Sequence, residues 1–296
     1  MQEKLLNLQR EIYLTETAEI GTQEKLNFYV GSSAMLYFFP INDFFSISFY
    51  GGGYDEAPDV KAKELDSDMN VAFCSFLDFI CEQENAEKIV SLTFDGPDEG
   101  ANGTNGWDFS RIVNSKVTFP NLRIFKVKLT DMGDHNQSII GSRYSMSEDG
   151  MIAKLIKKMP NLETLAVPSA PDKSFFDIGE HPLRQLIVQA GYNSQDFIEN
   201  FAESGNFYQL GALDFSDLHD SLDCYSEQDF IQFETYKKLF ESNAFSTSKH
   251  FHFTLRNSTL TKEQLYELQK INSNVQFLYI EKAKSRYVSN MMRAGK

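Results

Sequence analysis

Apolar residues recur along the chain as triplets at positions one, four and six of short segments. Polar residues alternate with them, which is typical of strands with one buried face. One such triplet is common by chance, whereas eight in series indicate a repeated structural unit. The triplets are Phe44/Ile47/Phe49, Ile89/Leu92/Phe94, Leu122/Phe125/Val127, Leu162/Leu165/Val167, Leu183/Leu186/Val188, Leu210/Leu213/Phe215, His250/Phe253/Leu255 and Val275/Leu278/Ile280.

Helical patterns occupy the intervals between these predicted strands. Residues 69–83 and 151–159 place apolar residues at three- and four-residue spacing, and the second pattern stops at Pro160, which cannot continue a helix. Three further helices are predicted at 196–203, at 228–242 and after the capping box Thr261–Gln264. The chain therefore alternates strand, loop and helix about eight times.

This alternation is compatible with two architectures. A doubly wound sheet requires strands that are apolar on both faces. Here each strand keeps one apolar side, while the other carries Arg, Lys, Glu, Thr and Gln. A strand with one solvated face favours a curved solenoid with an open concave surface. We therefore predict an α/β solenoid, or horseshoe, with a parallel sheet on its concave face and helices on its convex face.

Two strand segments, Leu162–Val167 (LETLAV) and Leu183–Val188 (LRQLIV), resemble the strands of leucine-rich repeats of the ribonuclease-inhibitor-like class. The carboxyl half is similar to bacterial cytoplasmic leucine-rich-repeat proteins in particular. The stretches that carry this similarity are 181–188, 255–261 and the long insert between Leu213 and Phe251. A fold-level resemblance of this kind implies binding rather than a particular chemistry.

The resemblance implies one domain with about eight irregular repeats over residues 44–285. Irregularity is expected because the Asn or Cys that the family places three residues beyond the third apolar position is missing. That position holds Thr130, Ala170, Gly191 or Leu218. Residues 1–43 are predicted to form an N-terminal cap, since a terminal repeat would otherwise expose its apolar side. The polar residues 286–296 are predicted to form a frayed tail.

Composition narrows the classes of function. The 296 residues include 28 basic and 42 acidic ones, a net charge of −14, which argues against binding to nucleic acid or to an anionic membrane. There is no uninterrupted apolar stretch of membrane-spanning length and no secretory signal core. Three cysteines cannot form a disulfide framework. We expect a soluble cytoplasmic protein without a cofactor, and the sequence leaves its oligomeric state open.

Side chains between the triplet positions are predicted to face the concave surface, because side chains alternate along a strand. Basic residues gather at the centre of this strip, although the chain as a whole is acidic. The predicted binding residues are Arg123, Lys126, Lys128, Glu163, Arg184, Gln185, Gln189, Asp214, His252, Thr254, Arg256, Gln276 and Tyr279. They favour a non-catalytic scaffold that binds a protein or peptide with an acidic patch. A merely solvated sheet face is the other interpretation.

Two acidic loops support an alternative, an enzyme or a metal-binding subunit. Residues 95–108 are rich in oxygen ligands but do not fit the twelve-residue calcium loop. Residues 214–224 combine Asp, His and Cys without a metal-ligand spacing. A third hypothesis is a dedicated partner of a biosynthetic enzyme. The glycines 51–53 lack the phosphate-loop spacing and are predicted to form a turn, and Trp107 is predicted to anchor its loop against the body.

Overall fold

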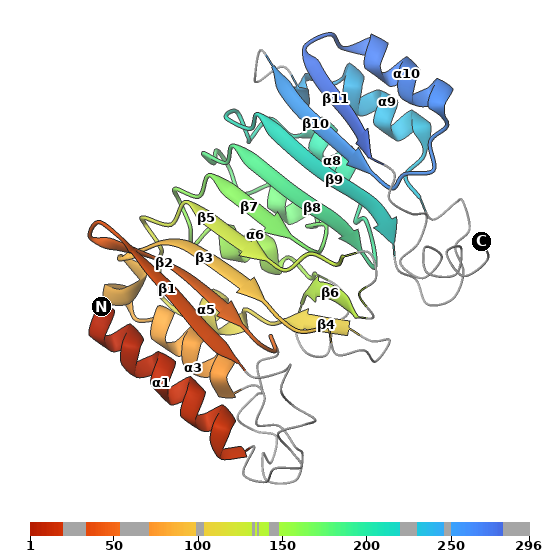
Figure 1. Ribbon diagram of the computed structural model, residues 1–296. Helices are drawn as coiled ribbons and strands as arrows, with labels where there is room; N and C mark the ends of the chain where they lie inside the picture. The colour runs from red at the N-terminus through yellow and green to blue at the C-terminus, as the bar shows by residue number, and fades with distance from the viewer. Residues whose placement is uncertain are drawn as a thin grey trace, which may run out of the picture.

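The structure, a computed structural model, describes residues 1–19, 34–53, 71–98, 104–131, 134, 136–141, 148–219, 230–245 and 250–280, without the side chains of 14–19 and 218–219. Its main feature is a nine-stranded sheet in which the strands lie side by side in chain order (Figure 1). The strands are β1 (Met35–Ile41), β2 (Phe44–Tyr50), β3 (Ile89–Asp95), β5 (Ile124–Val127), β7 (Thr164–Val167), β8 (Gln185–Gly191), β9 (Ala212–His219), β10 (Phe251–Arg256) and β11 (Val275–Ile280).

All neighbouring strands from β2 to β11 pair in parallel, and only β1 is antiparallel to its neighbour. The predicted α/β class with a parallel sheet is confirmed. The hairpin of β1 and β2 was not predicted. Its two-residue turn begins at Asn42, whose φ of 54° lies in the left-handed region that Asn tolerates better than most residues.

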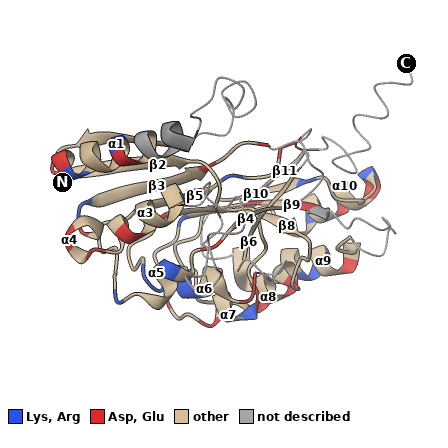
Figure 2. Ribbon diagram, turned by 90° about the horizontal axis from the view of Figure 1, so that it is seen from below, with Lys and Arg blue, Asp and Glu red and all other residues tan. Residues whose placement is uncertain are grey.

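Helices connect the strands and cover one face of the sheet (Figure 2). They are α1 (Gln2–Glu19), α3 (Val71–Ile80), α4 (Gln83–Ala86), α5 (Ser110–Asn114), α6 (Met151–Ile156), α7 (Lys173–Phe176), α8 (Phe197–Glu203), α9 (Phe233–Glu241) and α10 (Lys262–Ile271). The predicted capping box is present, because Gln264 and Thr261 exchange hydrogen bonds at the start of α10. Helix α1 packs against β1 and α3 at the sheet's first edge. Within the described residues, no helix is long and apolar enough to span a membrane.

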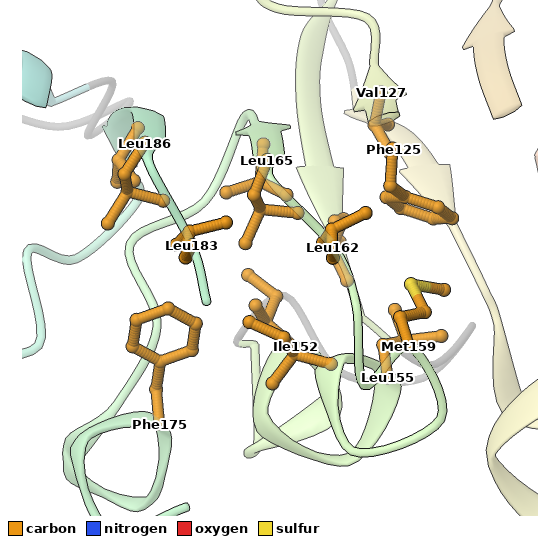
Figure 3. Packing of buried hydrophobic residues seen from close by; sticks show 14 of the residues in the cluster. Phe125, Val127, Ile152, Leu155, Met159, Leu162, Leu165, Phe175, Leu183 and Leu186 are labelled. Carbon is orange, nitrogen blue, oxygen red and sulfur yellow. The ribbon is translucent and has the colours of Figure 1, made fainter. Parts of the chain in front are cut away.

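The core lies between the sheet and this helical layer. The strand register aligns the second residue of each triplet, at position four of its segment, with that of the next strand. Leu92, Phe125 and Leu165 therefore form one buried row. Leu162, two residues before β7, points toward the helix residue Ile152 (Figure 3). Burying an aliphatic or aromatic side chain of this size contributes about 1.5–3 kcal/mol, so the aligned rows account for much of the stability.

Three details of the triplet prediction are wrong. Phe44 is only half-buried, and its neighbour Phe45 takes the core position opposite Ile89. Residue His250 is exposed and does not occupy a core position. In β11 the buried phase is shifted by one residue, because Phe277 pairs with the buried Phe253 and packs on the core, while Leu278 is 55% exposed. The register therefore places Leu278 on the face away from the helices.

A second, two-stranded sheet pairs β4 (Thr104–Trp107) with β6 (Gln137–Ile140). Trp107 is buried, and its indole Nε1 donates to Ser138 Oγ at 3.1 Å, so the predicted anchoring of this loop is confirmed. A Cβ atom on Gly53 would lie 2.4 Å from the Trp107 ring. Within the glycine segment 51–53, Gly53 therefore serves close packing against Trp107.

Candidate protein-binding surface

The candidate surface is the open face, by which we mean the side of the nine-stranded sheet opposite α3, α5, α6, α7, α8 and α9 (Figure 2). Within the described ranges, the helices α3 and α5 to α9 leave this side uncovered, and α1 borders it along the edge strand β1. Burial alternates along the strands, as in β10, where Phe253 and Leu255 are buried and His252 is exposed. The residues predicted for this face that the structure places on it or at its strand ends are Arg123, Lys126, Lys128, Glu163, Arg184, Gln185, Gln189, Asp214, His252, Thr254, Arg256 and Gln276.

The prediction for Tyr279 is wrong. This residue pairs with the buried Leu255, packs against the core, and donates its hydroxyl to the Ser258 carbonyl oxygen at 3.1 Å. Two residues three positions apart lie on opposite faces of a strand, so Gln276 and Tyr279 cannot share the open face.

Three charged residues lie side by side where β5, β7 and β8 begin. Arg123 Nη1 and Arg184 Nε lie 3.5 and 3.9 Å from the two carboxylate oxygens of Glu163. All three side chains are well exposed, so water screens these contacts and each contributes little to stability. Two cations share one carboxylate, which leaves a net positive charge where β5, β7 and β8 begin.

Further basic groups lie along the middle strands. Lys126 is exposed at the centre of β5. Lys128 is half-buried, and its ammonium donates to the Gly96 carbonyl oxygen at 2.7 Å. Two residues further along the chain, the backbone of Thr130 exchanges two hydrogen bonds of 2.8 and 2.9 Å with the side-chain amide of Gln189 on β8. Lys128 and Gln189 thus help to hold the loop after β5, whereas Lys126 projects into solvent.

The charges on β9 and β10 are arranged differently. The Arg256 guanidinium donates two hydrogen bonds of 2.6 Å to the Asp214 carboxylate, and this contact raises the pKa of the guanidinium. Fork-to-fork geometry of this kind is the strongest form of a protein ion pair. Asp214 and Arg256 neutralise one another, so the part of the open face formed by β9 and β10 carries little net charge.

In the described parts of the two acidic loops, the carboxylates of Asp217 and Asp108 accept hydrogen bonds from neighbouring groups. Asp217 is fully buried and accepts a hydrogen bond from the Tyr236 hydroxyl at 2.9 Å. Burial of Tyr236 raises the pKa of its phenol, and the nearby Asp217 carboxylate raises it further. Asp108 accepts the Ser110 amide at the start of α5. The described residues contain no group of three His, Cys, Asp or Glu that could hold a metal ion. Residues 99–103 and 220–224 lie outside the described part.

An apolar feature of the open face was missed by the sequence reasoning. β1 presents four large side chains to solvent, with exposed fractions between 41% and 64%, which we call the apolar row: Met35, Tyr37, Phe39 and Ile41. The register places Tyr37 opposite Ser48 and Phe39 opposite Ser46, on the same face as those residues. The segment MLYFFPI carried the signal, but its nearly continuous apolar run gave no alternation from which to assign a face.

Glu148 is a second residue that the sequence reasoning missed. Its side chain is buried at the start of α6 and accepts backbone amides of Gly150, Ile152 and Asp172. Burial raises the pKa of this carboxyl to about 7, against the opposing effect of the amide donors. The group joins α6 to the start of α7 and titrates near neutral pH.

The chain matches no protein-family model, no curated protein and no solved structure.

Proposed function

We propose that the chain is a leucine-rich-repeat solenoid whose open face binds a partner protein, without a catalytic role. The strand order and the aligned apolar triplets support the repeat assignment, since each strand, loop and helix packs mainly on its neighbours in the sequence. Side chains of the open face that project between buried ones form regular rows, which suits recognition of a surface rather than of a small substrate.

The charge of the middle strands is the observation that carries the proposal. From β3 to β8 this face bears the basic residues Arg123, Lys126, Lys128 and Arg184 and the acidic residues Asp95 and Glu163, that is 4 − 2 = +2. The chain as a whole carries −14. A positive patch on an acidic protein steers carboxylate-bearing partners to one place and repels them elsewhere.

Site-specific photo-crosslinking tests the proposal. A photoreactive residue is placed at Thr93 and at Thr254 on the open face, and matched positions are Lys157 and Glu203 on the helical side. Irradiation in cells of the source organism, followed by mass spectrometry, is expected to yield one partner from the open-face positions alone.

Capture from Lys157 and Glu203 alone, or from none of the four positions, would overturn the proposal. The identity of a captured partner also separates two forms of it. A single biosynthetic enzyme in stoichiometric amount would make the chain a dedicated partner of that enzyme. Several unrelated proteins would make it a general scaffold.

A further inference from the structure

The apolar row on β1 continues into an open cavity beside α1. The cavity has a volume of about 500 Å³, within the range of about 300–1,000 Å³ of typical ligand pockets. Its apolar lining comes from Leu6, Tyr13, Ala34, Met35, Leu36 and Tyr37. Leu6 and Tyr13 of α1 are 50% and 64% exposed, and Met35 and Tyr37 of β1 are 41% and 47% exposed, so both walls of the cavity are accessible. Monomeric proteins rarely leave so many large apolar side chains together in solvent, and such a patch marks an interaction site.

The backbone edge of β1 is closed to an added strand. Gln9 Nε2 of α1 donates to the Leu36 carbonyl oxygen at 2.6 Å, so the backbone groups of Leu36 point away from β2. Backbone groups alternate along a strand, so Phe38 and Pro40 share that direction, and Pro40 has no N–H to offer. A proline and a helix along an edge are devices that block strand pairing. A partner must therefore contact the side chains of the apolar row.

The register links the apolar row to the basic strands in a straight line. Tyr37 pairs with Ser48, Ser48 with Thr93, and Thr93 with Lys126. Three strand spacings of about 4.8 Å separate Tyr37 from Lys126, about 14 Å in all. Ser48 and Thr93 lie between them and have small hydroxyl side chains, so the surface is shallow between the two longer side chains of Tyr37 and Lys126.

Resting on the proposed function, we infer that the partner presents an acidic amphipathic segment to this line. Its apolar side chains pack on the apolar row and into the cavity, and its carboxylates reach Lys126 and Arg123. Arg10, which also lines the cavity, adds a third cation on the far side of the apolar row. Charge complementarity selects an acidic segment, and the apolar row selects one with large hydrophobic side chains.

Selection of random 16-residue peptides displayed on phage, against the immobilised full-length protein, tests this inference. The enriched peptides are expected to combine Asp or Glu with Leu, Phe or Trp. Their spacing should correspond to about 14 Å, which is about four residues in an extended segment or nine in a helix. Fluorescence anisotropy of an enriched, labelled peptide then gives its affinity for each variant.

Lys126→Glu and Phe39→Ser are each expected to weaken binding at least about tenfold. Matched controls are Lys157→Glu at the end of α6, with the same charge change, and Tyr266→Ser on α10, which removes a side chain as exposed as Phe39. Neither control should change the affinity by more than about twofold. Lys126→Gln, with an intermediate loss, guards against misfolding of the charge-reversal variant.

Enrichment of basic or neutral peptides, absence of enrichment, or equal effects of the test and control variants would overturn the inference. So would a dimer in light scattering that Phe39→Ser abolishes, because the apolar row would then bind a second copy of this chain. If photo-crosslinks from Thr254 persist in the Phe39→Ser and Lys126→Glu variants, the open face still binds a partner and only the acidic segment is excluded.

Discussion

The charged residues of the open face differ between its middle and its C-terminal part. On β9 and β10, Asp214 and Arg256 are joined by two hydrogen bonds of 2.6 Å, with side chains only 23% and 30% exposed. On β5 to β8, Arg123 and Arg184 lie 3.5 and 3.9 Å from Glu163, with side chains 46% and 64% exposed. The same residue types thus serve two purposes. Close, half-buried pairs belong to the fold, whereas loose, exposed pairs remain available to a partner.

The largest expected effect is on the buried side of the C-terminal part. Asp217→Ala removes the acceptor of the Tyr236 hydroxyl and leaves that phenol buried without a partner. We expect a loss of about 3 kcal/mol in the free energy of unfolding, measured by urea denaturation.

The matched change in the middle part is Glu163→Ala, which should cost less than about 0.5 kcal/mol because its partners are exposed. A loss below about 1 kcal/mol for Asp217→Ala would mean that the buried carboxylate of Asp217 contributes no more to the stability of the fold than the exposed carboxylate of Glu163.

Glu148 sharpens the comparison, because this carboxylate is buried among backbone amides and has a raised pKa. Its pKa of about 7 in the folded state exceeds the ordinary value of 4.5, so the folded protein binds more protons between these values. The corresponding stability is fully present below pH 4.5 and is lost as the pH rises through about 7. From pH 5 to 7.5 we expect a loss of about 2 kcal/mol in the free energy of unfolding.

Glu148→Gln keeps the shape and a carbonyl acceptor but does not titrate. Urea denaturation of both proteins at pH 5, 6 and 7.5 isolates the contribution of Glu148, because all other groups are common to the two. Parallel curves for the wild type and Glu148→Gln would show that the folded-state pKa of Glu148 is not raised.

A double-mutant cycle compares the two kinds of ion pair directly. Asp214→Asn, Arg256→Gln and the double variant are expected to give a coupling energy of about 1 kcal/mol, since the pair is bidentate and half-buried. Arg123→Gln with Glu163→Gln should give about 0.3 kcal/mol or less. The difference should narrow in 1 M salt, measured by the same denaturation experiment. Equal coupling energies in the two cycles would erase the distinction between the middle and the C-terminal part.

The sequence predicted β2, β3, β5, β7, β8, β9 and β10 because apolar and polar residues alternate there, whereas β4 and β6 of the two-stranded sheet were not predicted. β11 reads VQFLYI, in which both phases contain large apolar residues, so the pattern alone could not choose between Phe277 and Leu278. The strand also lies at the edge of the sheet, where a neighbour on one side only makes burial less decisive. β1 was not predicted for the same reason. In addition, an antiparallel hairpin adds no further copy of the repeated triplet, so the repeat pattern does not indicate it.

The charged pairs could be predicted from the sequence. Arg123, Glu163 and Arg184 occupy the second position of three consecutive triplet segments, which places them in one row once the register is assumed. Asp214 and Arg256 are diagonal neighbours by the same count. The sequence did not show that Asp217 and Glu148 are buried, because partners such as Tyr236 of Asp217 and Asp172 of Glu148 lie 19 and 24 residues away along the chain. The three-dimensional fold was therefore needed to identify the charged residues that stabilise the structure.

The smallest expected effect is a gain in binding. Glu163→Gln removes the carboxylate that Arg123 and Arg184 share, and so raises the net charge of the middle strands by one unit. For an acidic peptide selected on the open face, we expect an affinity about threefold higher at low salt, measured by fluorescence anisotropy. The gain should fall toward zero above about 0.5 M salt, where the screening length is shorter than the distance between the charges. Asp214→Asn alters charge equally, but outside the peptide's predicted path, and should leave the affinity within about 1.5-fold. A weaker affinity for Glu163→Gln would mean that this carboxylate itself accepts a donor from the partner, and that the middle strands do not act as a positive patch.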